Sequence, residues 1–139
     1  MVSSVFLDDW ELGERDRPVQ LDPDAVEAVI REVGPRWSAD LFLLADSDDV
    51  ESASRWLAVT ASSGQYAVVA QLAEDGPWVS LLGAADAEGE IEFARGGQPG
   101  RLARRFCVDV DDAVAVARHY VATAEVLDPR RWWVDEGAS

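Results

Sequence analysis

Two residues of types that commonly act as nucleophiles, proton carriers or metal ligands occur once each, His119 and Cys107. On a helical wheel His119 points about 180° away from Val110 and the apolar stripe of its helix, so we expect it to be solvated. Cys107 follows Phe106 in an apolar stretch, which is typical of a small buried residue rather than a reactive thiolate. Ordinary zinc sites and internal disulfides need more histidines or cysteines than this chain has.

Sequence motifs of the common enzyme classes are also missing. There is no Gly-x-Ser-x-Gly nucleophile elbow, no phosphate-binding loop ending in lysine and no dinucleotide-binding glycine pattern. Carboxylates are so numerous that a pair of them is no guide to acid–base catalysis. We therefore predict that the protein is not an enzyme, has no catalytic residue, and needs neither a metal nor a cofactor.

Acidic residues gather in two short segments, 46–51 and 86–92. The first reads Asp-Ser-Asp-Asp-Val-Glu, but a calcium-binding EF-hand loop needs glycine at its sixth position and glutamate at its twelfth, where this chain has Glu51 and Leu57. The simplest interpretation is a solvated loop, and the alternative is contact with a basic partner. Two tryptophans serve as candidate aromatic anchors beside these acids. The candidate partner-binding residues are Trp37, Asp46, Asp48, Asp49, Glu51, Asp86, Glu88, Glu90 and Trp132.

A basic loop lies between the second acidic segment and the C-terminal part of the chain. Four of the twelve basic residues fall within eleven positions around the glycine-rich stretch 96–100, namely Arg95, Arg101, Arg104 and Arg105. Such a loop could bind a small anion through backbone N–H groups and guanidinium groups. The simpler interpretation, which we favour, is that these arginines neutralise Glu90 and Glu92.

Two helices are predicted to position these residues. Asp22 is a good N-cap, Pro23 suits the first helical position, and Gly34 with Pro35 ends the helix. The second helix has Asp109 as its N-cap and is expected to close at 128–129. Apolar residues recur every three or four positions in both segments, which predicts one buried face on each helix.

The middle of the chain reads as strands joined by glycine turns. Apolar runs at 39–45, 55–61, 65–72, 77–82 and 91–94 predict an antiparallel meander. Further strands are expected at 104–108 and near Trp133, and residues 1–20 are expected to form an edge strand at 5–7 followed by a charged loop at 11–18. Trp56, Trp78 and Trp133 are expected in the core or on a sheet face. We predict one α+β domain over 1–139, with an antiparallel sheet of about five or six strands and two main helices packed on one face.

The net charge restricts the partners. Twenty-seven acidic residues face twelve basic ones, giving a formal net charge of −15, and all the basic residues are arginine. Such a surface repels nucleic acid and anionic lipids and attracts basic proteins. The hydrophobic content of 48% indicates a folded body. No stretch approaches the roughly 20 apolar residues of a membrane span, and no basic signal segment follows Met1. We expect a cytoplasmic protein that contacts neither nucleic acid nor membrane, and the oligomeric state stays open.

The order of these elements is more specific than any single motif. A capped helix from Asp24 precedes a leucine-rich strand at 41–44 and strands at 56–59 and 64–69, and then come the Gly96-Gly97-Gln98 loop, the helix opening at Val110 and the tryptophans at 132–133. Over roughly residues 23–133, this order resembles the Imm1 family of bacterial immunity proteins, which are common beside polymorphic-toxin genes in actinobacteria.

The resemblance implies a role in binding. Members of such a family neutralise a cognate secreted toxin, for example a nuclease or deaminase, by stoichiometric contact, and no catalytic residue comes with the resemblance. A basic toxin would suit the acidic surface, since complementary charge raises association rates, and occlusion of the toxin's active site is the expected mechanism. Two alternatives remain open: a small-anion-binding module on the Arg95–Arg105 loop, and a secretion chaperone that holds its partner without inhibiting it.

Overall fold

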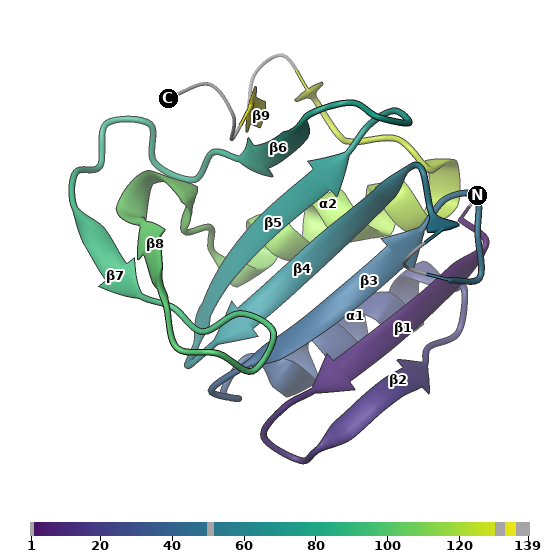
Figure 1. Ribbon diagram of the computed structural model, residues 1–139, viewed down its shortest axis with the longest axis horizontal. Coiled ribbons are helices and arrows are strands. Elements are labelled where there is room, and N and C mark those ends of the chain that lie inside the picture. Colours follow the sequence, from purple (N-terminus) through teal and green to yellow (C-terminus); the bar gives the residue numbers. More distant parts are fainter. Residues whose placement is uncertain (1, 50–51, 130–132, 136–139) are drawn as a thin grey trace.

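The architecture is a seven-stranded antiparallel sheet with both long helices on one face and a small two-stranded sheet at one end (Figure 1). The computed structural model describes residues 2–49, 52–129 and 133–135. The strand order of the large sheet is β2-β1-β3-β4-β5-β6-β9. Its strands are β1 (Ser4–Asp9), β2 (Glu14–Pro18), β3 (Ala39–Leu44), β4 (Trp56–Ser62), β5 (Gln65–Gln71), β6 (Trp78–Leu81) and β9 (Trp133–Asp135). The small sheet pairs β7 (Glu90–Glu92) with β8 (Arg101–Ala103), and the 3-10 helix η2 (Arg104–Phe106) follows.

Capping residues start both helices where the sequence predicts. In α1 (Pro23–Val33), the Asp22 carboxylate accepts a hydrogen bond from the Ala25 amide at 3.3 Å. In α2 (Val110–Thr123), Asp109 accepts from the Asp112 amide at 2.8 Å. The predicted end of the second helix at 128–129 is wrong. The backbone turns left-handed at Ala124, whose φ is 59°, and the helix stops there.

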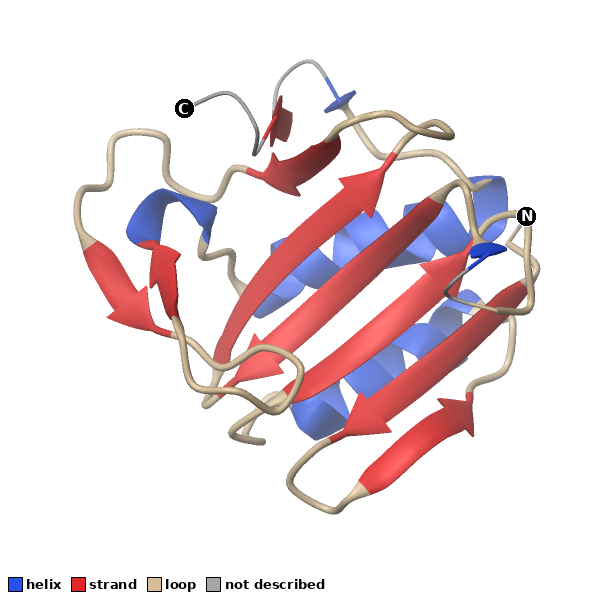
Figure 2. Cartoon of the chain, viewed as in Figure 1, coloured by secondary structure: helices blue, strands red, loops and turns tan. Residues whose placement is uncertain are grey.

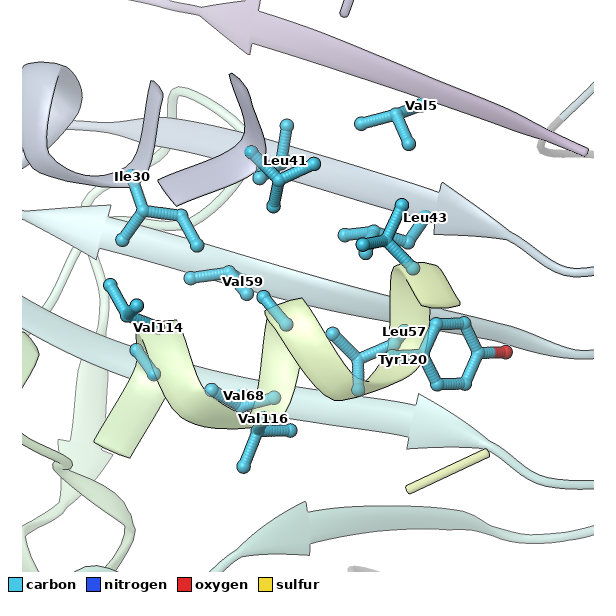
Figure 3. Close-up of a cluster of buried hydrophobic side chains, with 14 of the residues drawn as sticks. Val5, Ile30, Leu41, Leu43, Leu57, Val59, Val68, Val114, Val116 and Tyr120 are labelled. Carbon is cyan, nitrogen blue, oxygen red and sulfur yellow. The ribbon is translucent and has the colours of Figure 1, made fainter. Parts of the chain in front are cut away.

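The main core lies between the two helices and one face of the sheet. Figure 2 shows both helices on that single face, as predicted. Alternate strand residues point toward the helices, and the register places Leu41 opposite Leu7 on one side and Val59 on the other. These side chains pack against Ile30 and Tyr120 in the cluster drawn in Figure 3. The α+β class is therefore confirmed.

The N-terminal strand is not the edge strand that the sequence predicts. β1 pairs with β3 on one side and with β2 on the other, so β2 forms the edge. The segment expected to be a charged loop supplies this strand, with the sequence Glu-Arg-Asp-Arg-Pro. An edge strand needs only backbone pairing on one side, and charged side chains protect it from further pairing. Such a strand has no alternating apolar pattern by which it could be found.

Two other strand predictions are wrong. Residues 91–94 do not continue the meander, because β7 pairs with β8 rather than with β6. Residues 104–106 form η2 instead of the strand predicted at 104–108, and the preceding strand β8 begins at Arg101, in the predicted basic loop. The neighbour of β6 is instead β9 from the C-terminal part, as the prediction of a strand near Trp133 allows. The large sheet thus has seven strands among the described residues, not five or six.

A second, smaller core explains why this part leaves the sheet. Ile91, Phe93, Leu102 and Phe106 bury one another against Ala67 of β5. The segment 90–106, which we call the β7–β8 lobe, therefore covers one end of the sheet face that the helices leave free (Figure 1). The remainder of that face stays open.

Candidate functional site

The open part of the helix-free face is an aromatic surface set by strand register. Phe42 on β3 lies between Phe6 and Ala58, and Ala58 in turn lies beside Val69. Because side chains alternate along a strand, all four point away from the helices. Both long helices lie on the opposite face of the sheet in Figure 2.

Two tryptophans form the centre of this surface. The rings of Trp56 and Trp78 meet edge to face, with centroids 5.2 Å apart and planes at 81°. Both indole N–H groups donate to the same acceptor, Gln71 Oε1, at 3.2 Å each. The Gln71 amide is itself held by the carbonyl of Ala73 at 3.1 Å. Trp78 is 54% exposed, so this orientation is fixed by polar contacts rather than by burial.

A hollow of about 400 Å³ opens over these rings, and we call it the aromatic hollow. It is lined by Asp40, Phe42, Ala53, Trp56, Ala58, Thr60, Val69, Gln71, Trp78 and Arg95. A neighbouring hollow of about 660 Å³, the acidic hollow, is lined by Phe6, Asp8, Trp10, Arg15, Asp16, Asp40, Phe42, Asp48, Asp49 and Gly96. The two share Asp40 and Phe42 and therefore adjoin, and we call them together the groove.

Asp40 holds the junction between the two hollows in place. The residue is only 6% exposed, and its carboxylate accepts three hydrogen bonds. The donors are Trp10 Nε1 at 2.9 Å, Thr60 Oγ1 at 2.7 Å and the Gly96 amide at 3.1 Å. The next residue, Gly97, has φ 74° and lies against the Trp10 ring, where an added Cβ would come within 2.7 Å of Cε3. The Gly-Gly stretch is thus a structural connection between lobe and sheet.

The residues of the first predicted acidic segment have two different roles. Asp46 accepts hydrogen bonds from the amide and the hydroxyl of Ser54 and from the Arg55 amide, so its carboxylate closes the loop on itself. The hydrogen bond from the Ser54 side chain lowers the pKa of Asp46 below its ordinary value. Asp48 and Asp49 line the acidic hollow. Glu51, predicted with them, lies outside the described residues.

The second predicted acidic segment lies elsewhere. Asp86, Glu88 and Glu90 are exposed and belong to the lobe side of the molecule, while the loop after β3 lies on the opposite side in Figure 1. Trp37 is 39% exposed and lines a separate hollow of about 800 Å³ that also includes Arg101. Trp132 lies outside the described residues. The structure therefore brings Asp48 and Asp49 together with the aromatic surface. It does not place Trp37, Asp86, Glu88 or Glu90 there.

The four clustered arginines have different surroundings, and Arg104 is exposed at the start of η2. Arg101 pairs with Glu90 at 3.7 Å, as the simpler interpretation of the basic loop predicts. Arg95 and Arg105 lie over the rings of Phe93 and Phe106, 5.8 and 4.8 Å from the ring centroids. The aromatic hollow contains Arg95, and the hollow beside Trp37 contains Arg101. An anion site formed by these arginines together stays a prediction that this arrangement does not favour.

The two residues of catalytic type lie apart from the groove. Cys107 packs against the core of the β7–β8 lobe, in agreement with a small packing residue. His119 on α2 is partly buried, not fully solvated as expected. Within residues 2–49, 52–129 and 133–135, no group of three or more histidine, cysteine, aspartate and glutamate side chains is placed to hold a metal ion. No helix in the described part of the chain is long and apolar enough to cross a membrane.

Sequence reasoning missed the residues at the centre of the groove. Phe42 stands inside a continuous apolar run, which hides the alternation that separates the two faces of a sheet. In β4 the alternation is visible, since Trp56, Ala58 and Thr60 share one face and the buried Leu57 and Val59 share the other. That signal could have assigned Trp56 to a face, although not to a face without a helix.

Comparison with known proteins gives one finding. The model of the family described as "Immunity protein Imm1" matches residues 15–132, which is most of the chain. No curated protein matches the chain. The matched segment contains both helices, every strand from β3 to β8, and most of the residues that line the groove. This chain belongs to the Imm1 family of immunity proteins.

Proposed function

We propose that the protein neutralises the toxin domain of a polymorphic-toxin system by stoichiometric binding that covers the toxin's active site. Membership of a family of immunity proteins supports binding rather than catalysis as its mode of action. The observation that carries the proposal is the groove on the helix-free face, where the tryptophan pair, with Trp78 exposed and Trp56 partly buried, adjoins a cluster of carboxylates. Exposed aromatic side chains are enriched at the centres of protein interfaces.

The charge of the chain supports a basic toxin. A net charge of −15 gives long-range attraction to a positively charged domain, such as a nuclease or deaminase that must hold nucleic-acid phosphates. Complementary charge raises the association rate, and an antidote benefits from rapid capture of its toxin. We place this encounter in the cytoplasm as part of the proposal, because a chain with a single cysteine has no disulfide that would need an oxidising compartment.

Only some of the predicted contact residues belong to the groove. Asp48 and Asp49 line the groove and are retained as contacts, and Asp46 holds their loop in shape. Asp86 and Trp37 lie on other surfaces. Their role as contacts stays a prediction, which mutation of each residue tests separately from the groove.

Co-expression tests the proposal. The toxin domain encoded by the neighbouring gene is expressed alone and together with this protein in a host that it kills. We expect growth to be restored, and a catalytically inactive variant of the toxin to form a complex of fixed stoichiometry in light scattering. Continued killing in cells that contain soluble protein would refute neutralisation. A complex that forms while the toxin stays active would indicate a chaperone that only holds its partner.

A further inference from the structure

We infer that the toxin binds across the helix-free face, with one segment that places an arginine in the acidic hollow and a neighbouring apolar side chain in the aromatic hollow. The inference rests on the proposed function, since it names the surface and the chemistry through which neutralisation would occur. The two hollows share Asp40 and Phe42, so one continuous segment can occupy both.

The aromatic hollow offers a ready anchor site. Trp56 and Trp78 are already oriented by each other and by Gln71, so a partner does not have to order them on binding. The floor of the hollow is apolar, formed by Phe42, Ala58 and Val69. An apolar side chain that enters it removes the exposed ring of Trp78 from water. Tryptophan in such a position is typical of a binding hot spot.

The acidic hollow selects a cation. Five carboxylates line it against a single guanidinium, that of Arg15. Arg15 is already engaged, because it pairs with Asp8 at 3.6 Å and lies 4.2 Å from the centroid of the Trp10 ring. The hollow therefore keeps a negative field that an incoming cation would offset. An arginine fits better than a lysine, because its planar fork can bind carboxylates bidentately and stack on an aromatic ring, and both kinds of group are present.

Charge argues against a second copy of this chain as the occupant. A self-complementary contact through this face would bring one carboxylate cluster toward its own image, in a molecule that already has fifteen excess negative charges. Repulsion between like charges opposes such a contact. A basic partner would instead be attracted to this face, because its charge is opposite to that of the carboxylates.

The test compares matched variants in binding to the catalytically inactive toxin domain. Trp78→Ala and Asp48→Arg change the two hollows, and Trp37→Ala and Asp86→Arg make the same changes at exposed positions on other surfaces. We expect the Kd to rise about thirtyfold for Trp78→Ala and about tenfold for Asp48→Arg. The two controls should stay within about threefold of the wild type. The affinity of the wild type for the toxin should fall as the salt concentration rises, and the affinity of Asp48→Arg should fall less steeply. Thermal unfolding of each variant confirms that it is folded.

The outcomes separate the inference from the proposed function. If the wild type rescues growth but the Trp37 and Asp86 variants lose affinity while the groove variants keep it, the surface assigned here is wrong and neutralisation stands. If the wild type neither binds nor rescues, the proposed function fails and the inference falls with it. If the wild type dimerises by light scattering and Trp78→Ala abolishes the dimer, a second copy occupies the groove and the inference is overturned.

Discussion

Replacing Asp40 tests whether the junction of the groove is held by hydrogen bonds. In the Asp40→Ala variant, Trp10 Nε1, Thr60 Oγ1 and the Gly96 amide all lose their acceptor. Each bond ends on a carboxylate, and hydrogen bonds to charged groups contribute about 1.5–3 kcal/mol. Gly96 is exposed and Trp10 is partly exposed, so water can replace the acceptor there, whereas Thr60 is only 8% exposed.

Three such bonds would together contribute at least about 4.5 kcal/mol if nothing replaced the acceptor. Because water can replace it at Trp10 and Gly96, we expect Asp40→Ala to lower the free energy of unfolding by a smaller amount, about 3 kcal/mol. For a chain of this size, that corresponds to a fall in Tm of about 10 °C. Asp40→Asn should cost only about 1 kcal/mol, because the amide oxygen can accept from Trp10 and Gly96 while the amide nitrogen donates to the Thr60 hydroxyl, which can rotate to accept.

Urea unfolding followed by tryptophan fluorescence measures these differences, with Asp86→Ala as the exposed control, expected within about 0.5 kcal/mol of the wild type. The order of stability should be wild type, then Asp40→Asn, then Asp40→Ala. An Asp40→Ala variant as stable as the wild type, or an asparagine variant as unstable as alanine, would refute the assignment of Asp40 as the acceptor that joins lobe and sheet.

Further predictions concern the tyrosines and Asp46. Tyr66→Phe should lower the free energy of unfolding by about 1 kcal/mol, because the buried Tyr66 hydroxyl donates to the Ile30 carbonyl at 2.8 Å. Tyr120→Phe should leave the free energy of unfolding unchanged or raise it, because the buried Tyr120 hydroxyl has no hydrogen-bond partner within the described part of the chain. Urea unfolding compares the pair, and equal losses would contradict this. Burial raises the pKa of Tyr120 to about 12. Since the unfolded pKa of tyrosine is about 10, the corresponding stability is complete below about pH 10 and is lost as the pH rises through 12. Tyr120→Phe should therefore lose less stability than the wild type between about pH 10 and 12. Asp46→Ala should speed hydrogen exchange of the Ser54 amide at neutral pH. The pKa of Asp46 is lowered, so in the wild type the protection of the Ser54 amide should persist above pH 3.8 and disappear as the pH falls through the lower folded pKa. Unchanged exchange of this amide in Asp46→Ala would show that the carboxylate does not close the loop.

Local signals in the sequence account for the parts of the fold that were predicted correctly. The caps Asp22 and Asp109 fix the helix starts, because each carboxylate satisfies a backbone N–H group a few residues away. Apolar runs locate β3, β4 and β5, which pair with their neighbours in sequence. The excess of carboxylates likewise follows from composition alone, and the basic partner that it favours stays a prediction.

Only the tertiary structure decides what these elements present to a partner. The charged edge strand β2 has no alternating pattern, since backbone pairing with β1 alone keeps it in the sheet. Asp8 and Asp48 are forty residues apart and meet in one hollow because β1 pairs with β3 and the loop after β3 turns back over the sheet. Trp78 is apolar by type yet exposed, because both helices pack on the opposite face of the sheet. Sequence fixes which residues are apolar or charged, but which of them remain uncovered depends on long-range packing, and in this protein that packing places an aromatic pair beside a cluster of carboxylates.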